Sequence, residues 1–144
     1  MVGSRKLLAE PALERLAEIA RRVGAAEPDV LAVYLYGSAA RREPAADIDV
    51  AVLLERNADL TTLERLAAAL QQEGAPAGPE LDVRALRGTG PRFRTNVLRE
   101  GRLLFERRTD ARIEFEAVSM SEWLDFKPTW ERMRAQMLER WAHG

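Results

Sequence analysis

Three aspartates have the spacing that could support chemistry in this sequence. Asp47 and Asp49 are two residues apart in an apolar segment predicted to be a strand, so both side chains point to the same face. Asp82 lies in the middle of a later predicted strand and would join them if the two strands are neighbours. At ~5 Å and an effective dielectric constant of ~20, each pair of carboxylates repels by about 3 kcal/mol. The cluster therefore predicts a bound cation more readily than three solvent-facing strand residues.

The composition limits which cation this cluster could take. The chain contains no Cys and a single His, His143, next to the C-terminus. A thiolate or His-rich zinc site is therefore excluded, and the ligands must be oxygens. Oxygen ligands with open positions suit Mg²⁺, which also binds substrate phosphates. Two such ions could hold both the attacking and the leaving oxygen in a phosphoryl-type transfer.

A Gly-Ser pair directly follows the first apolar strand. Gly37 lets the backbone approach a ligand closely, and Ser38 could cap a short helix whose N–H groups attract phosphate. Arg41 and Arg42 follow one turn later and could pair with phosphate oxygens. Such a pair alone is usually an ordinary turn. Its position shortly before the paired aspartates favours a phosphate-binding turn.

Hydrophobic periodicity predicts the elements that must position these residues. Helices are expected over 11–25, 60–73, 92–100 and 109–142, the last interrupted near Pro128, and strands over 30–36, 47–54, 80–86 and 102–106. Loops are expected over 74–79 and 87–94. After Gly37, which ends the first apolar run, only the nine residues Ser38 to Ala46 precede the second strand, and a parallel crossover needs a dozen or more. These strands are therefore expected to be antiparallel neighbours in a mixed sheet, joined by a tight, partly helical turn.

Length and charge bound the class of protein. With 144 residues, of which 47% are hydrophobic, the chain is expected to form one domain over 1–144. A formal net charge of -1 argues against a protein that binds nucleic acid through its phosphates. The sequence contains no recognisable targeting segment and no apolar run of the ~20 residues that a membrane helix needs. A soluble, cytoplasmic protein without membrane or nucleic-acid partners is expected.

The C-terminal helical segment, 109–142, carries large apolar side chains at intervals of three or four residues. Such a stripe either covers the sheet and closes the core or forms a surface for a partner protein. The segment allows both, with one half packed and the other presented. The stripe consists of Trp123, Phe126, Trp130, Met133, Met137 and Trp141.

Two stretches resemble a known family. The stretch LYGSAARREPAADIDVAVLL, with Asp82 on a later strand, resembles the signature of the DNA polymerase β-type nucleotidyltransferases, and the small size resembles their minimal members. The stretch REGRLLFERRTDARIEFEAVSMSEWLDFKP resembles the MntA-like antitoxins that pair with HEPN-domain toxins. The resemblance covers about residues 30–130. It implies an α/β (α+β) nucleotidyltransferase fold with a mixed sheet flanked by helices.

The resemblance also implies roles for individual residues. Gly37 and Ser38 would hold a nucleoside triphosphate, with Arg41 at a position where the minimal members commonly have Arg. Asp47 and Asp49 would hold Mg²⁺, and Asp82 would complete the metal site and could accept the proton of the acceptor hydroxyl.

The sequence departs from the family pattern at three points. Eight residues separate Ser38 from Asp47 where ten are common, and Arg42 and Ala46 stand where Gly and Ser are common. No carboxylate is missing.

The leading functional hypothesis is an adenylyltransferase antitoxin. In this antitoxin branch the implied substrate is ATP, the acceptor is a tyrosine of a HEPN-type toxin, and pyrophosphate is released. Two alternatives stay open: an antitoxin that only binds and occludes its partner, and an adenylyltransferase that modifies a small molecule such as an antibiotic. The cost of keeping three unneeded carboxylates together argues against a purely occluding protein.

Overall fold

The computed structural model of the protein describes residues 7–74 and 80–143. Most of the loop predicted over 74–79 lies outside the described residues. Its first residue, Gly74, ends α3. In chain order the elements are α1 (Glu10–Ala25), β1 (Val30–Tyr36), α2 (Gly37–Ala40), β2 (Ile48–Leu54), α3 (Leu60–Gly74), β3 (Leu81–Ala85), α4 (Pro91–Glu100), β4 (Arg102–Glu106) and α5 (Thr109–His143).

The four strands form one mixed sheet in the order β3-β2-β1-β4. Strand β1 is antiparallel to both β2 and β4, whereas β3 is parallel to β2. The short link between β1 and β2 contains the single turn of α2, as the spacing predicted. The parallel pair is joined by a longer connection that includes α3. The predicted mixed sheet and its antiparallel first pair are therefore confirmed.

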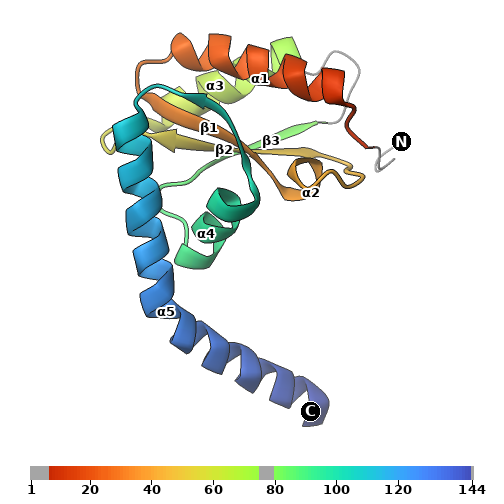
Figure 1. Ribbon diagram of the computed structural model, residues 1–144, viewed down its shortest axis with the longest axis vertical. Helices are drawn as coiled ribbons and strands as arrows, with labels where there is room; N and C mark the ends of the chain where they lie inside the picture. The colour runs from red at the N-terminus through yellow and green to blue at the C-terminus, as the bar shows by residue number, and fades with distance from the viewer. Residues whose placement is uncertain (1–6, 75–79, 144) are drawn as a thin grey trace.

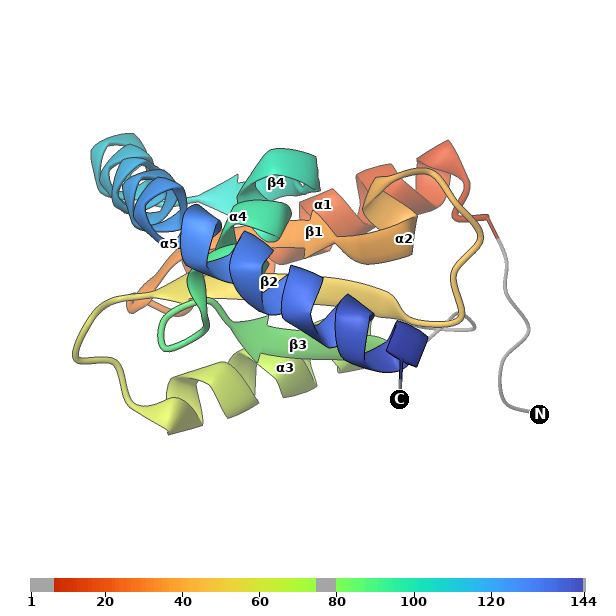
Figure 2. The same cartoon turned by 90° about the horizontal axis from the view of Figure 1, so that it is seen from below.

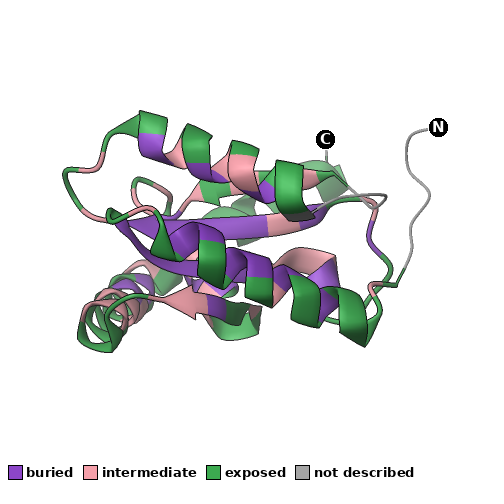
Figure 3. Cartoon of the chain, turned by 90° about the horizontal axis from the view of Figure 1, so that it is seen from above, coloured by how far each residue is buried: buried purple, intermediate pink, exposed green. Residues whose placement is uncertain are grey.

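Helices cover both faces of the sheet and create two separate cores. Helices α1 and α3 lie on one face, and α4 with the first half of α5 lies on the other (Figure 1). Side chains alternate between the faces: Val50 and Val52 of β2 belong to the α1/α3 core, whereas Ala51 and Leu53 belong to the α4/α5 core. Figure 3 shows the central strands buried and the outer sides of α1 and α3 exposed.

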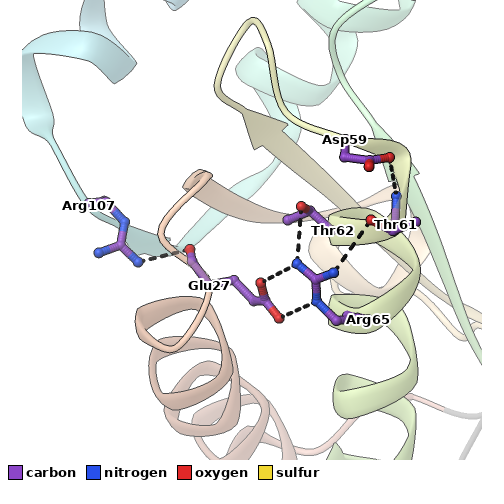
Figure 4. A network of polar contacts seen from close by, with 6 residues as sticks. All are labelled: Glu27, Asp59, Thr61, Thr62, Arg65 and Arg107. Atoms are coloured by element: carbon purple, nitrogen blue, oxygen red, sulfur yellow. Dashed lines mark hydrogen bonds and ion pairs between the residues drawn. The ribbon is translucent and has the colours of Figure 1, made fainter.

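A polar network fastens the end of α1 to its neighbours (Figure 4). The guanidinium of Arg65 in α3 donates two hydrogen bonds of 3.1 Å to the carboxylate of Glu27. Arg107, just after β4, donates from Nη2 to the carbonyl oxygen of Glu27 at 3.0 Å. Asp59 accepts a hydrogen bond of 3.1 Å from the backbone N–H of Thr61 and so caps the start of α3. Glu27, just after α1, is thus tied both to α3 and to the residue that follows β4.

Helix α5 does not stop at Pro128. The predicted interruption is wrong, because the helix runs unbroken from Thr109 to His143 with the proline inside it. Proline removes one backbone N–H donor, a loss that a long helix tolerates by bending. Figure 1 shows α5 changing direction about halfway and its second half leaving the domain.

None of the helices formed by residues 7–74 and 80–143 combines the length and the hydropathy of a transmembrane span.

Candidate active site

A row of three side chains crosses one end of the sheet. Tyr36 at the end of β1 pairs in register with Asp49 of β2, and Asp49 pairs with Asp82 of β3. Paired residues on neighbouring strands point to the same face, about 4.8 Å apart. The row lies on the face that α4 and α5 partly cover, because Tyr34 and Ala51, two residues along their strands, belong to that core. The structure thus brings Asp82 next to Asp49.

In this row, the surroundings of Asp49 are unfavourable for a negative charge. Asp49 is half-buried, and burial raises the pKa of its carboxyl group above the usual value, with further increases from the charges of Asp82 and Asp47. Arg84 and Arg41 partly offset the increase. A half-buried carboxylate beside two others favours a counter-charge such as a metal ion or a cationic side chain.

Asp47 lies one residue before β2 and is exposed. Together with Glu80, Leu81 and Asp82 it lines a hollow of about 270 Å³. The backbone keeps the two sides of this hollow together, since the N–H of Ile48 donates to the carbonyl oxygen of Glu80 at 3.0 Å. Glu80 was not expected here. It is the first residue of the strand predicted over 80–86, but the pairing that brings it near Asp47 is a long-range contact.

The carboxylates do not form a complete metal cage. Across residues 7–74 and 80–143, no group of three or more Asp, Glu or His side chains is placed to hold one metal ion. Mg²⁺ rarely needs such a cage, because it binds one or two carboxylates and fills its other positions with water and substrate phosphates. The adjacent Asp49 and Asp82 fit that donor set. The Mg²⁺ site, with either one or two ions, stays a prediction.

Gly37 places the backbone directly against the row. Its φ is +73°, a conformation that glycine adopts without steric cost. A Cβ at this position would overlap Oδ2 of Asp49. The turn after β1 therefore contacts the Asp49 carboxylate, and it can do so only because residue 37 has no side chain.

The predicted capping role of Ser38 is wrong. Ser38 is the second residue of α2, and the N-cap position falls on Tyr36, where no side-chain hydrogen bond caps the helix. The reason is that β1 runs into α2 without an intervening residue. The Tyr36 ring packs edge-on against Phe93 of α4, with centroids 5.5 Å apart. Ser38 still lies next to Gly37, and its binding role stays a prediction.

The two arginines after α2 have different surroundings. Arg41 is on the side of the carboxylates, where its charge lowers the pKa of Asp49, and its Nη1 lies 3.3 Å from Oε2 of Glu100. Arg42 instead pairs with Glu10 of α1. Its φ is +62°, a left-handed backbone conformation that glycine adopts most readily, although residue 42 is an arginine here.

Arg84 is a site residue that the sequence analysis missed. Its Nε lies 3.6 Å from Oδ2 of Asp82, and its charge opposes the increase in the pKa values of Asp49 and Tyr36. Burial, followed by the charge of Asp49, raises the pKa of Tyr36. The available signal was the spacing, since residues 82 and 84 of a strand share a face.

The basic segment over 87–94 contacts α5. The guanidinium of Arg87 lies 5.2 Å from the ring centroid of Phe115, and that of Arg92 lies 4.6 Å from the centroid of Trp130. Arg94 forms an ion pair with Glu122. These arginines therefore hold the first half of α5 and its bend against the domain.

A mixed sheet with paired carboxylates at the start of one strand and a glycine turn against them defines a nucleotidyltransferase-type domain. Residues 18–110, well over half of the chain, match the family Polymerase beta, Nucleotidyltransferase. The protein belongs to this family, which confirms the predicted enzyme class. No curated relative matches the sequence significantly.

Solved structures share the fold. A chain from a complex of tri-AMPylated Shewanella oneidensis HEPN toxin with MNT antitoxin is 20% identical, with a TM-score of 0.66 over 88% of this chain and 98% of that chain. A chain from a toxin–antitoxin structure with AMP-PNP is 20% identical, with a TM-score of 0.65 over 81% and 94%. A protein described as a minimal nucleotidyltransferase is 30% identical, with a TM-score of 0.51 over 69% and 98%.

Proposed function

We propose that the protein is a Mg²⁺-dependent adenylyltransferase that modifies a tyrosine of a HEPN-type toxin and thereby acts as its antitoxin. The observation that carries the proposal is the row of Asp49 and Asp82 beside the Gly37 turn, within the matched family domain. The choice of ATP and of a toxin acceptor is supported by two similar structures, one with a tri-AMPylated HEPN toxin and one with AMP-PNP.

The proposed reaction transfers AMP. The tyrosine oxygen forms a bond to the α-phosphorus of ATP, the bond from that phosphorus to the bridging oxygen of the β-phosphate breaks, and pyrophosphate leaves with the electron pair. Asp82 accepts the hydroxyl proton. Bound Mg²⁺ would offset the charge that develops on the phosphate oxygens and on the leaving group.

Each site residue has a proposed task. Asp47, Asp49 and Asp82 supply the oxygen ligands for Mg²⁺. The backbone of Gly37 and Ser38 and the guanidinium of Arg41 contact the triphosphate. Arg42 is left out of this set because it pairs with Glu10 of α1, whereas the charge of Arg41 acts on Asp49. Arg84 positions Asp82 through their ion pair.

An antitoxin that only occludes its partner is the second candidate. It is favoured by the exposed apolar side chains in the second half of α5, Met133, Met137 and Trp141, which suit a bound partner protein. Asp47→Asn separates the two. Loss of neutralisation with an intact complex supports the enzyme, whereas unchanged neutralisation supports occlusion.

The direct test is the intact mass of the partner. The protein is co-expressed with the product of its neighbouring gene, incubated with ATP and Mg²⁺, and the partner is weighed by mass spectrometry. We expect a gain of one or more AMP units, located on tyrosine by peptide fragmentation and abolished by EDTA and by Asp49→Asn. Asp29→Asn is the matched control, because this exposed aspartate lies before β1, at the other end of the sheet. A stable inhibited complex without any gain in mass would overturn the transferase.

A further inference from the structure

The second half of α5 presents an apolar face to solvent. Trp130, Met133, Met137 and Trp141 are spaced three or four residues apart and so lie on one side of the helix. These four residues are called the apolar stripe below. Exposure increases along it, from 45% at Met133 through 55% at Met137 to 87% at Trp141.

The stripe continues the face by which α5 packs on the domain. Trp123, two turns before Trp130 on the same face, is buried. Trp130 is half-buried against the guanidinium of Arg92. Beyond that turn, every described residue of α5, over 131–143, is exposed. Side chains with the same spacing therefore pack on the domain up to Trp130 and face solvent after it.

The exposed half of α5 lies on the side of the molecule that carries the row of Tyr36, Asp49 and Asp82. Figure 1 shows it leaving the domain on the α4 side, and Figure 2, seen from that side, shows it passing across β2 and β3. That face of the sheet bears Asp49 and Asp82. A protein bound to the stripe would therefore be held on the same side as the carboxylates.

Helix α5 is an addition to the catalytic domain. The family match ends at residue 110, and α5 begins at Thr109. The minimal nucleotidyltransferase aligns with 69% of this chain, whereas the chain from the toxin–antitoxin complex aligns with 88%. The matched family domain therefore lies almost entirely before α5.

The charges beside the stripe indicate what kind of surface would cover it. Arg134 lies one turn after Trp130, and Arg140 lies three residues after Met137, so cationic side chains border the stripe on both sides. Glu139 lies on the opposite side, at about 100° per residue. Two copies of a stripe bordered by arginines would repel each other. An apolar groove with an acidic rim would complement it.

We propose that the apolar stripe is the docking surface for the protein acceptor, which receives it in an apolar groove rimmed by acidic side chains. This inference rests on the proposed transfer to a protein acceptor. Docking on an extension that carries no catalytic group holds the acceptor hydroxyl at high local concentration near Asp49 and Asp82. The partner is recognised at a distance from the reacting tyrosine.

The test places a carboxylate on either side of the exposed helix. Met137→Asp disrupts the stripe, and Ala135→Asp puts the same residue on the opposite face as the matched control. Both positions are exposed, so both variants are expected to fold. We measure binding to the neighbouring gene's product by size-exclusion chromatography with light scattering, AMP transfer by intact mass, and Mg²⁺–ATP binding by the shift in Tm.

We expect Met137→Asp to weaken the complex and slow AMP transfer at limiting partner by at least about tenfold, the size of a lost anchor residue. Ala135→Asp should change both by less than about twofold, and both variants should keep the Mg²⁺–ATP shift. Equal binding and transfer by the two variants would overturn the docking surface while the proposed function stands.

Other outcomes separate the two proposals. A wild-type complex that Met137→Asp breaks but that never transfers AMP would overturn the proposed function and support the docking surface. A wild-type chain that dimerises through the stripe, without any effect of Met137→Asp on the partner, would assign the stripe to self-association. Neither complex nor transfer would overturn both.

Discussion

At the scale of single residues, the backbone of Gly37 contacts the Asp49 carboxylate only because residue 37 has no side chain. We expect Gly37→Ala to lose about 1 kcal/mol of stability, because φ is positive there, and to lose AMP transfer, because the new Cβ displaces the Asp49 carboxylate. Gly88→Ala is the matched control. Its φ is +85°, but no described atom lies within 4 Å of the added Cβ. Thermal melts should show a similar loss for both variants, and transfer assays a loss only for Gly37→Ala. Full activity of Gly37→Ala would contradict the proposed site.

Asp49 gives a second prediction at this scale. The folded state raises the pKa of Asp49 through burial and the charges of Asp82 and Asp47. The folded state therefore holds this proton more tightly, and stability is lost as pH rises through the ordinary value of ~3.9 towards the raised one. Asp49→Asn escapes this loss, so without Mg²⁺ its Tm should exceed that of wild type at neutral pH and approach it in acid. With Mg²⁺ and ATP the order should reverse. A lower Tm of Asp49→Asn without ligand would refute the assignment.

At the scale of elements, Arg112 fastens α5 to the sheet. It pairs with Glu106 of β4 and, at 2.9 Å, with Glu116 of α5, which accepts a hydrogen bond of 2.9 Å from the Tyr34 hydroxyl. The hydrogen bond from Arg112 lowers the pKa of Glu106. This stabilisation is present above the ordinary pKa of 4.5 and is lost as pH falls through the lowered value.

Arg112→Met should therefore lower the Tm at neutral pH by a few degrees, with the difference shrinking in acid. Arg108→Met is the control, because its ion pair with Asp110 is exposed and contributes little. Equal melts of the two variants across the pH range would show that the Arg112 network does not anchor α5.

The elements themselves were largely predictable from sequence. The strands over 30–36 and 102–106 have the predicted bounds, because glycine or charged residues end each apolar run. The pairing of the first two strands followed from the length of their link. Three features could not be predicted from periodicity, because they depend on how the chain packs in the three-dimensional fold. They are the continuation of α5 through Pro128, the N-cap position of α2 at Tyr36, and the position of Glu80 beside Asp47.

At the scale of the whole molecule, the sequence pattern alone could not divide α5 into a packed and an exposed half. Core and interface stripes share the spacing of three or four residues, and the same aromatic and Met side chains suit both. The division depends on where the domain ends beneath the helix. Trp123 in the first half of α5 is still buried, whereas Trp141 near its end is 87% exposed.

This division predicts that catalysis and acceptor binding can be separated. In a chain ending at residue 129, the deleted part contains Trp130, which is half-buried, and a segment that is otherwise exposed throughout 131–143. The fold should therefore persist with a Tm within a few degrees of wild type. Mg²⁺ and ATP should still stabilise it, by about 2.7 kcal/mol at a hundredfold excess over Kd. Asp49→Asn in the same shortened chain should abolish that shift. AMP transfer to the partner should fall sharply, because the docking surface is gone. A shortened chain that no longer responds to Mg²⁺ and ATP would instead make α5 part of the nucleotide site.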